Sequence, residues 1–395
     1  MKVTITPAKL CGKIDAIASK SFAHRIMIAS ALADKPTKIN LNTTSEDIES
    51  TKKCLLSMGT KIEEGEGFIT ISPVTYAKNA VLDCNESGST ARFLLPVAAT
   101  ICDSFKMRGS GRLPERPMTP LISQMRLHGV EINSDKIPLE AIGKLNGGKF
   151  EIPGDISSQY ITGLLLALPN CTEKSEIVLT SPLQSRAYVD ITIGVLKQFG
   201  IEVLKTENSF IIKPQKFISP DGITVEGDWS NSAFWIVANE ICGNVLVDGL
   251  NYDSLQGDMN ILISKDETRI DASEIPDLVP ILAVLACARK GKTIIYNAER
   301  LRIKESDRLE TVRKSLSSLG ADIEETKDGL IINGTGSLKG GECESFNDHR
   351  IAMSCAIASC ICENKVIIKD AQAVNKSYPK FFEDFESLGG KIVIE

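Results

Sequence analysis

The sequence has neither an excess of positive charge nor a long apolar run. Its 45 Lys and Arg residues are outnumbered by 51 Asp and Glu residues, which gives a net charge of −6. Such a chain has no bulk attraction to nucleic acid or to an anionic membrane, so any anion site must be built locally from a few basic residues. The most apolar stretch, Ile281 to Ala288, is too short to cross a bilayer, which takes about 20 residues. Met1 to Ile5 alternate apolar and polar residues and contain no signal-peptide core.

The cysteines lack the patterns that disulfides and zinc sites require. There are 11, an odd number, and most stand singly in apolar stretches, as Cys287 and Cys355 do. Cys360 and Cys362 form a C-x-C with no second pair and no histidine at ligand spacing. The pattern therefore predicts free, buried thiols in a reducing compartment, no metal, and a soluble cytoplasmic protein.

Length and composition indicate a globular protein of two domains. A single core rarely grows beyond about 250–300 residues, and this chain has 395. Apolar residues make up 43% and charged residues 24%, which is ordinary globular composition and argues against disorder. No feature of the composition indicates an interface with another chain, so we expect a monomer.

A helix end followed by a strand recurs along the chain. Each copy has apolar residues, a glycine and then alternating residues, as in residues 55–62. The glycines of five copies are Gly59, Gly129, Gly200, Gly320 and Gly389. The first three are 70 and 71 residues apart, and the last two are 69 apart. The remaining interval is 120, close to two repeats, so residues 259–270 could hold a degenerate copy.

This repeat predicts the fold class. A glycine in the left-handed conformation ends each helix, and the strand after it has one solvent-exposed face. Although Leu-x-x-x-Gly is common at helix ends, the near-constant spacing favours a true repeat. Units of about 70 residues are longer than common solenoid repeats, and each can hold several strands and two helices. We expect a layered α/β (α+β) fold of two similar domains with three repeats each.

Three segments in the first half place Lys or Arg among Ser, Gly and Pro. In Ser19 to Arg25, free amides at a helix start attract an anion, but an N-cap with exposed basic residues explains the segment as well. Glu86 to Arg92 follows a strand and suits a phosphate or carboxylate, or is a plain capping turn; it lacks the Gly-Lys-Ser/Thr of a P-loop. Gly109 to Pro117 holds two arginines, which form an anion clamp or pair with acidic neighbours.

Two further segments precede apolar helices expected at residues 161–168 and 191–199. They are Ser157-Ser158-Gln159-Tyr160 and the run from Ser185 to Asp190, which includes Tyr188. Hydroxyls and an amide at helix starts can orient a polyhydroxylated, phosphorylated ligand, although each segment alone is an ordinary cap.

The second half contains its own charged segments. Asp277 follows Ile275-Pro276 at the start of an apolar helix, near its positive end. The run 302–308 would place Lys304 and Arg308 at i and i+4 on one helical face, with Glu305 beside them. A solvated charged face explains that run equally well.

A histidine and an arginine open the last apolar helix. Asn347-Asp348-His349-Arg350 precedes a nearly charge-free helix expected at residues 351–358, and Lys376 follows within Asn375 to Pro379. A solvated face explains this pair less well, because the helix it opens is apolar.

Taken together and in this order, these segments resemble 5-enolpyruvylshikimate-3-phosphate synthases, a family of enolpyruvyl transferases, over the whole chain. The family fold has two similar domains, each of three βαβαββ units forming an inside-out α/β barrel, with the ligands in the cleft between them. The resemblance implies one domain of residues 1–18 and 225–395, an inserted domain of residues 19–224, and a hinge near 16–20 and 221–228. The most specific motifs are Lys20-Ser21 with Arg25, Ser157 to Gln159, Lys304 to Arg308, and Asn347 to Arg350.

The resemblance also implies a site and two substrates. The residues it assigns to phosphoenolpyruvate are Lys20, Gly88, Arg112, Gln159, Arg308, Arg350 and Lys376. Those it assigns to shikimate 3-phosphate are Lys20, Ser21, Arg25, Ser157, Ser158, Gln159, Ser185, Tyr188, Asp277 and Lys304. The acid/base positions are Asp277, Lys304 and Glu305, and no metal or organic cofactor is implied.

The implied chemistry explains these residue types. Phosphoenolpyruvate is protonated at C3, the shikimate 5-hydroxyl attacks C2, and proton loss from the tetrahedral intermediate expels phosphate. Basic groups offset the substrate phosphates and carboxylates, while carboxyl groups move protons. Glu305 would shuttle the C3 proton and Asp277 would take the hydroxyl proton, with Lys304 assisting.

The chain departs from the commoner family pattern in two places. Many members have Asn-Ala-Gly-Thr where this chain has Glu86-Ser87-Gly88-Ser89, and Arg300 stands where a neutral ligand-contacting residue is frequent. The resemblance makes glyphosate an expected inhibitor, and Gly88, having no Cβ, would leave space for its extra length. Alternatively, Gly88 serves only a positive backbone φ.

Two other functions fit parts of the pattern. UDP-N-acetylglucosamine enolpyruvyl transferase shares the fold and the donor, but usually has a reactive cysteine in the loop that here spans residues 109–117 and contains none. A non-catalytic anion-binding module would not need carboxylates such as Asp277 and Glu305 beside its anion site.

Overall fold

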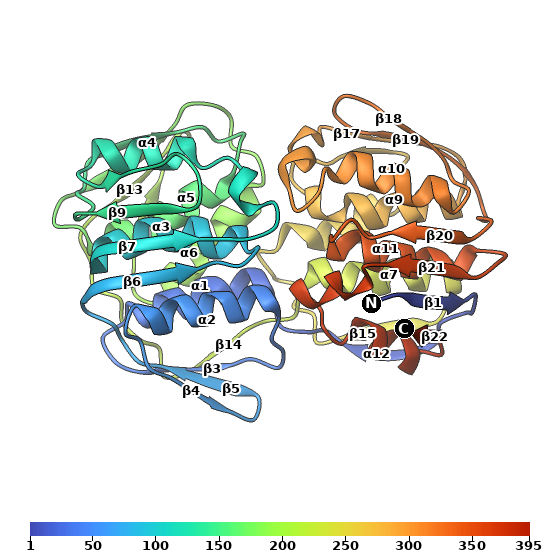
Figure 1. The fold of residues 1–395 in the computed structure, drawn as a ribbon, viewed down its shortest axis with the longest axis horizontal. Coiled ribbons are helices and arrows are strands. Elements are labelled where there is room, and N and C mark those ends of the chain that lie inside the picture. The colour runs from blue at the N-terminus through green and yellow to red at the C-terminus, as the bar shows by residue number, and fades with distance from the viewer. The chain divides into compact units, whose positions relative to one another are not determined.

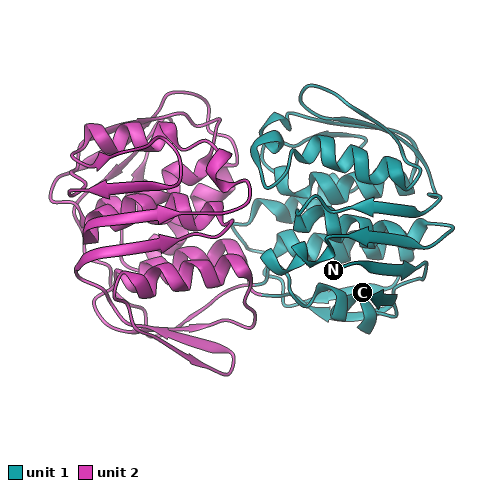
Figure 2. Cartoon of the chain, viewed as in Figure 1, with its two compact units in different colours: residues 1–17, 227–395 teal, residues 18–226 magenta.

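The chain folds into two compact units, each with its own hydrophobic core. The computed structural model describes all 395 residues. Unit 1 comprises Met1–Ile17 and Gly227–Glu395, and unit 2 comprises Ala18–Glu226 (Figure 2). The buried apolar side chains form one cluster in each unit, as the length of the chain predicts.

Five of the six sheets have four strands in the same arrangement. The first two strands run parallel, and the second pairs antiparallel with a third strand, which pairs antiparallel with the fourth. In unit 2 the strand orders are β14 (Ile223–Thr224), β3 (Thr37–Asn40), β5 (Phe68–Ile71), β4 (Ile62–Gly65); β6 (Ala77–Asp83), β7 (Cys102–Arg108), β9 (Leu139–Ile142), β8 (Glu131–Ile132); and β10 (Lys149–Ile152), β11 (Ser175–Leu179), β13 (Ser209–Ile212), β12 (Val203–Lys205). In unit 1 they are β16 (Arg269–Asp271), β17 (Lys290–Tyr296), β19 (Leu330–Thr335), β18 (Asp322–Glu325); and β20 (Gly341–Glu344), β21 (Val366–Lys369), β1 (Val3–Thr6), β22 (Lys391–Ile394). The third and fourth strands form a hairpin in four of these sheets, whereas in the fifth they are β1 and β22, from the two ends of the chain.

The sixth sheet, in unit 1, is the degenerate copy. It contains only the parallel pair β15 (Val245–Asp248) and β2 (Gly12–Asp15). The chain then forms η3 (Gly257–Asn260) and the four-residue α8 (Ile261–Ser264) before it enters β16, without a hairpin. The long interval between the repeated glycines therefore does contain a shortened repeat.

The repeated glycines close helices as predicted. Gly59, Gly129, Gly200, Gly320 and Gly389 have φ values of 97°, 93°, 75°, 97° and 94°. In each copy the amide after the glycine donates to a carbonyl five residues earlier, as Thr60 does to Leu55. This is the Schellman pattern, in which a left-handed residue satisfies the last carbonyls of a helix.

Three helices in each unit are buried almost all round, with the sheets and the other helices outside them (Figure 1). They are α1 (Lys20–Ala31), α3 (Gly88–Ile101) and α5 (Ser158–Ala167) in unit 2, and α7 (Trp229–Cys242), α9 (Val279–Ala288) and α11 (His349–Ala358) in unit 1. Within each trio the helices contact one another. The outer helices have exposed faces: α2 (Glu46–Ser57), α4 (Thr119–Leu127), α6 (Arg186–Gln198), α10 (Arg308–Ser318) and α12 (Phe381–Ser387).

Three helices begin earlier than the apolar pattern predicts. The expected starts were Ile161, Ile191 and Ile351, whereas α5, α6 and α11 begin at Ser158, Arg186 and His349. Local caps account for two of these differences. The Ser157 hydroxyl accepts a hydrogen bond from the Gln159 amide at 3.3 Å, and the Asp348 carboxylate accepts one from the Arg350 amide at 3.0 Å. Polar side chains expected in preceding loops therefore lie in the first helical turns.

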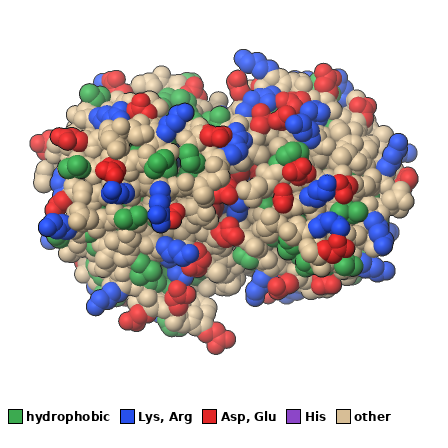
Figure 3. All heavy atoms as spheres, viewed as in Figure 1, with side chains coloured by type: hydrophobic (Ala, Val, Ile, Leu, Met, Phe, Trp, Pro, Cys, Tyr) green, Lys and Arg blue, Asp and Glu red, His purple; other side chains and the backbone are tan.

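The surface carries mixed charge, as the composition predicts, and eight of the eleven thiols are buried, whereas Cys242 and Cys360 are half-buried and Cys11 is exposed. Charged side chains of both signs are interspersed over the visible face of each unit (Figure 3). All eleven cysteines are free, and no group of three or more His, Cys, Asp or Glu side chains is placed to hold a metal ion. None of the helices has both the length and the apolar character needed to span a bilayer.

Candidate active-site residues at the helix starts

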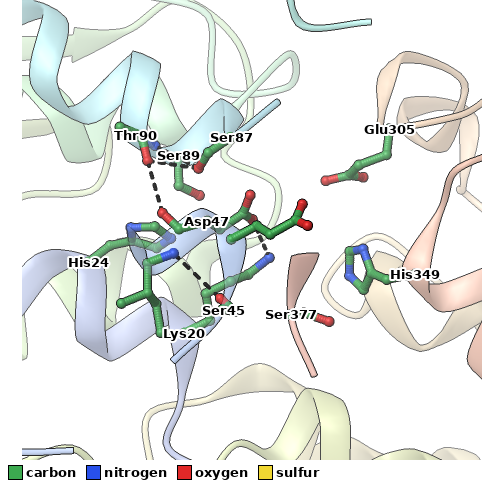
Figure 4. A network of polar contacts seen from close by, with 12 residues as sticks. Lys20, His24, Ser45, Asp47, Ser87, Ser89, Thr90, Glu305, His349 and Ser377 are labelled. Carbon is green, nitrogen blue, oxygen red and sulfur yellow. Dashed lines mark hydrogen bonds and ion pairs between the residues drawn. The ribbon is translucent and has the colours of Figure 1, made fainter. Parts of the chain in front are cut away.

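Lys20, in the first turn of α1, is joined to the starts of two other helices of unit 2. Its Nζ lies 2.6 Å from Oδ2 of Asp47 in α2, and the two side chains are 17% and 13% exposed. The Asp47 carbonyl accepts a hydrogen bond from the Thr90 hydroxyl of α3 at 3.4 Å, and Thr90 also contacts Ser87 at 2.8 Å (Figure 4). A cation therefore sits where three helix starts meet.

Arg25 lies in the interior of unit 2. Its Nε donates to Thr192 at 2.8 Å, and its Nη1 donates to the Ser21 carbonyl at 2.6 Å. Its Nη2 donates to the Tyr188 carbonyl at 2.9 Å. Burial lowers the pKa of Arg25 to about 9. The structure thus brings together Arg25, Ser21 and Tyr188, and these contacts tie α1 to α6. Ser185 is the residue that precedes α6.

Gln159 links the starts of α5 and α3. Its Nε2 donates to the Ser89 hydroxyl at 3.0 Å, while its Oε1 accepts from Nη1 of Arg92 at 2.9 Å. Arg92 also donates to the Pro117 carbonyl at 3.0 Å, which ties down the 109–117 loop. Ser157 caps α5 and Ser158 is its buried first residue. Arg92 was not among the predicted site residues, although it ends one of the segments that suggested an anion site.

Gly88 makes room for two guanidinium groups. It opens α3 without a positive φ, so the alternative explanation of this glycine by backbone conformation is wrong. A Cβ at this position would lie 2.6 Å from Nη1 of Arg116 and 2.7 Å from Nη1 of Arg92. Arg116 is buried, whereas Arg112 is partly exposed and its Nε lies 3.7 Å from Glu115. The two arginines of the loop thus differ in environment.

Arg308 is the centre of a carboxylate cluster in unit 1. Its side chain is 1% exposed, and its nitrogens lie 2.8 Å from Asp348, 2.8 Å from Asp277 and 2.6 Å from Glu305. Burial alone would lower the pKa of Arg308, but the three carboxylates outweigh it and raise that pKa. Asp348, which is fully buried and also accepts from Ser306 at 2.9 Å, was not predicted as a site residue.

Lys304 and Arg308 do not share a helical face, so that prediction was wrong. The helical turn η5 (Glu299–Ile303) ends before Lys304, which is extended. A new helix begins at Arg308, because the Asp307 carboxylate caps it by accepting from the Glu310 amide at 3.2 Å. Both side chains nevertheless approach Asp277: the Lys304 Nζ is 3.7 Å and the Arg308 Nη1 is 2.8 Å from Oδ1.

Asp277 lies among three cations. Besides Lys304 and Arg308, Arg350 places Nη2 3.1 Å from its Oδ2 and donates through Nη1 to its carbonyl at 3.0 Å. Burial alone would raise the pKa of Asp277, but Arg350, Lys304 and Arg308 together hold it well below its usual range. Burial also lowers the pKa of Lys304, and the nearby charge of Arg308 lowers it further.

The start of α11 collects the remaining predicted groups. Lys376, at the end of η7 (Ala371–Lys376), is buried and donates to the Asn347 carbonyl at 2.6 Å. Asn347 has a φ of 55°, a left-handed conformation. His349 is buried beside Asp348, with Nδ1 3.9 Å from its Oδ1.

Comparisons with known proteins agree with this architecture and these segments. Residues 5–268 and 262–385 match the family described as EPSP synthase (3-phosphoshikimate 1-carboxyvinyltransferase). The 3-phosphoshikimate 1-carboxyvinyltransferase of Clostridium novyi (strain NT) is 43% identical, with 99% of this chain and 98% of that protein covered. That of Clostridium kluyveri is 41% identical, with 99% and 98% covered.

A solved structure shares the fold. EPSP synthase from Acinetobacter baumannii matches 100% of both chains with a TM-score of 0.82, at 24% identity. The fold is thus the two-domain inside-out α/β fold. With the family match over nearly the whole chain and relatives above 40% identity, the chain belongs to the EPSP synthase family.

The Arg308 cluster generates a stability prediction. Replacing Arg308 by Ala leaves Asp348, Asp277 and Glu305 without their shared cation, and removing one partner of a buried ion pair costs about 3–5 kcal/mol. We expect that loss in the free energy of unfolding of unit 1, measured by urea denaturation with circular dichroism.

Lys314→Ala is the matched control for Arg308→Ala. Lys314 lies on the same helix and pairs with Glu310 at 2.6 Å, but both side chains are more than two-fifths exposed, so its loss should cost about 0.5 kcal/mol or less. Equal effects of the two substitutions would contradict the prediction.

Proposed function

We infer that this chain transfers the enolpyruvyl group of phosphoenolpyruvate to the 5-hydroxyl of shikimate 3-phosphate, giving 5-enolpyruvylshikimate 3-phosphate and phosphate. This is the reaction of the shikimate pathway that leads towards chorismate and the aromatic amino acids. Family membership supports the reaction class. The observation that carries the chemistry is Asp277, a partly buried carboxylate held ionised among Lys304, Arg308 and Arg350.

The basic groups at the helix starts suit two substrates that carry phosphate and carboxylate groups. We assign phosphoenolpyruvate to Lys20, Gly88, Arg112, Gln159, Arg308, Arg350 and Lys376. We assign shikimate 3-phosphate to Lys20, Ser21, Arg25, Ser157, Ser158, Gln159, Ser185 and Tyr188, with Asp277 and Lys304. Amides at helix starts add to the attraction of anions. Arg92 and Arg116 support this set by holding Gln159 and by flanking Gly88.

The carboxylates supply the proton transfers. In this proposal Glu305 delivers a proton to C3 of phosphoenolpyruvate and later removes one from the same carbon, which expels phosphate. Asp277 accepts the proton of the attacking 5-hydroxyl. In the free enzyme its three cations make it a weak base. Substrate anions that bind those cations offset their positive charge. The pKa of Asp277, and with it the basicity of this carboxylate, therefore rises when both substrates are present.

The first alternative function is that of UDP-N-acetylglucosamine enolpyruvyl transferase, which uses the same donor, phosphoenolpyruvate. That reaction usually relies on a reactive cysteine, and the loop between Gly109 and Pro117 has none. A binding module without catalysis is the other rival. It would gain nothing from Glu305 beside an anion site.

The chain is further proposed to act as a cytoplasmic monomer whose two units close on the substrates. The assigned ligand contacts fall in both units, so the site must open to admit substrates and close to exclude water. Residues 16–20 and 221–228 flank the two places where the chain passes from one unit to the other, and we propose them as the hinge. The free thiols suit a reducing compartment.

Phosphate release tests the reaction. Release should require both phosphoenolpyruvate and shikimate 3-phosphate and should persist in EDTA. UDP-N-acetylglucosamine should not replace the acceptor. A Lys20→Ala preparation, purified identically, controls for contaminating phosphatase, because losing this charge should lower kcat/KM about 30-fold or more. Equal release with UDP-N-acetylglucosamine, or none with either acceptor, would overturn the assignment.

Gly88→Ala tests the glyphosate expectation. One added methyl in a packed site costs about 1–3 kcal/mol, which is roughly a 5- to 150-fold loss of binding. We expect the inhibition constant for glyphosate to rise by that factor and more than the KM for phosphoenolpyruvate, because glyphosate is longer. Equal rises in both constants would instead assign the effect to displacement of Arg116 and Arg92 by the new Cβ. The melting temperature controls for damage to the fold.

Small-angle scattering tests closure and oligomeric state. Shikimate 3-phosphate together with glyphosate should reduce the radius of gyration, and the forward scattering should give the chain mass of 42.9 kDa. Each ligand alone, and both ligands with Lys20→Ala, serve as controls. An unchanged radius of gyration with both ligands bound would contradict closure of the two units. A mass twice that of the chain would contradict the proposed monomer.

A further inference from the structure

A buried carboxyl group lies behind Arg350 and has no role in the reaction as described. Arg350 donates through Nη2 to the Ser230 hydroxyl at 2.8 Å, and the same Nη2 lies 3.1 Å from Oδ2 of Asp277. Ser230 is in the first turn of α7 and is hydrogen-bonded in turn to Asp258 of η3. Ser230, Arg350 and Asp258 are all buried. The order Asp258, Ser230, Arg350 is therefore a chain of contacts within unit 1.

The loop that carries Asp258 is fixed to the start of α7. The Gln256 side chain accepts from the Trp229 amide at 3.1 Å and donates to the Gly227 carbonyl at 2.8 Å. The Trp229 indole nitrogen donates to the Asn251 carbonyl at 2.9 Å. These contacts place η3 against the helix that presents Ser230, so the pairing of Asp258 with Ser230 follows from the backbone arrangement.

The charges around Arg350 are unusual for an anion site. Asp277 contacts Arg350 directly, and Asp228, the buried cap of α7, interacts with Asp258. With Glu305 and Asp348 nearby on Arg308, this part of unit 1 has five carboxyl groups. The basic groups among them are Lys304, Arg308 and Arg350, with Arg300 close enough to act on Lys304 and with Lys376 hydrogen-bonded to Asn347, beside Asp348. A further anion at Arg350 would offset the positive charge that helps to keep Asp258 ionised, so anion binding favours uptake of a proton by Asp258.

We propose that Asp258, acting through Ser230, is a positioning residue that orients Arg350 for a substrate anion and takes up a proton when that anion binds. The proposal rests on the proposed function, in which Arg350 binds phosphoenolpyruvate. Ser230 is the only side chain in the contact chain between the two charged groups. Asp258 is thus near enough to sense the charge at Arg350 while remaining away from the reacting atoms.

The titration of Asp258 fits this role. Burial, and then the charge of Asp277, raise the pKa of Asp258 to about 6, with a smaller contribution from Asp228. Arg350 and the hydrogen bond from Ser230 act in the opposite direction. An anion on Arg350 offsets its charge and raises the pKa further. Binding and protonation are therefore linked, and the affinity for the anion should fall as the pH rises above about 6.

The test compares the pH dependence of the KM for phosphoenolpyruvate in three proteins, between about pH 5.5 and pH 8. These are the wild type, Asp258→Asn and Asp253→Asn, whose residue lies exposed in the same loop. The side-chain amide introduced by Asp258→Asn can still accept from Ser230 but cannot take up a proton. If anion binding raises the pKa by about one unit, the wild-type KM should rise roughly five- to tenfold more than that of Asp258→Asn over this range. The titration of phosphoenolpyruvate itself cancels in this ratio.

Other parameters separate positioning from a purely structural role. The kcat and the KM for shikimate 3-phosphate should change less than about threefold in Asp258→Asn, because Asp258 touches no reacting atom. Asp253→Asn should follow the wild type at every pH. A KM ratio between wild type and Asp258→Asn that stays constant within about twofold across this pH range would overturn the proposal. An inactive wild type would instead contradict the proposed function.

Ser230→Ala keeps the proposal testable if Asp258→Asn does not fold. Because the hydrogen bond from Ser230 lowers the pKa of Asp258, its removal should raise that pKa. The pH at which KM for phosphoenolpyruvate begins to rise should therefore move upward. An unchanged midpoint in a folded variant, verified by its melting temperature, would contradict the linkage.

Discussion

Buried helix starts are the constraint on which the rest of the structure depends. Each unit has three central helices that are buried almost all round, and the first amides of a helix have no partner within it. The chain meets this requirement with hydroxyl and carboxylate caps, such as Ser87 for α3, Asp228 for α7 and Asp348 for α11. Cations stand in or beside the same turns. Polar groups therefore concentrate at the starts of these buried helices, and many of the residues proposed for substrate binding lie there.

The same constraint makes the basic side chains rigid before any ligand arrives. Arg308 is held by three carboxylates, Arg25 by Thr192 and by the carbonyls of Ser21 and Tyr188, and Lys376 by the Asn347 carbonyl. Side chains already held in place lose little conformational freedom on binding, which favours affinity. The ligand must, however, share these cations with internal carboxylates. The chemistry proposed for Asp277 depends on this competition.

Local signals in the sequence were sufficient for the architecture, and long-range contacts were not predictable. The glycines identified the helix ends, because a helix end depends on a few adjacent residues. The interval between these glycines identified the number of repeats. The expectation for Lys304 and Arg308 failed because capping by Asp307 interrupts the helical periodicity. The contact of Gln159 with Ser89 joins residues 70 apart, and that of Arg308 with Asp348 joins residues 40 apart. Asp258 looks like any loop aspartate until the fold places it beside Ser230.

The pairing of β1 has a consequence for synthesis of the chain. β1 is hydrogen-bonded on one side to β21 and on the other to β22, which includes residues 391–394, and β2 pairs with β15. Unit 2 is encoded between these partners, as residues 18–226. On the ribosome, where domains generally fold as units as they emerge, unit 2 can complete its sheets while the first strand still waits. The sheet of β1 is complete only when β21 and β22 have left the exit tunnel, so β1 is synthesised before unit 2 but is paired after it.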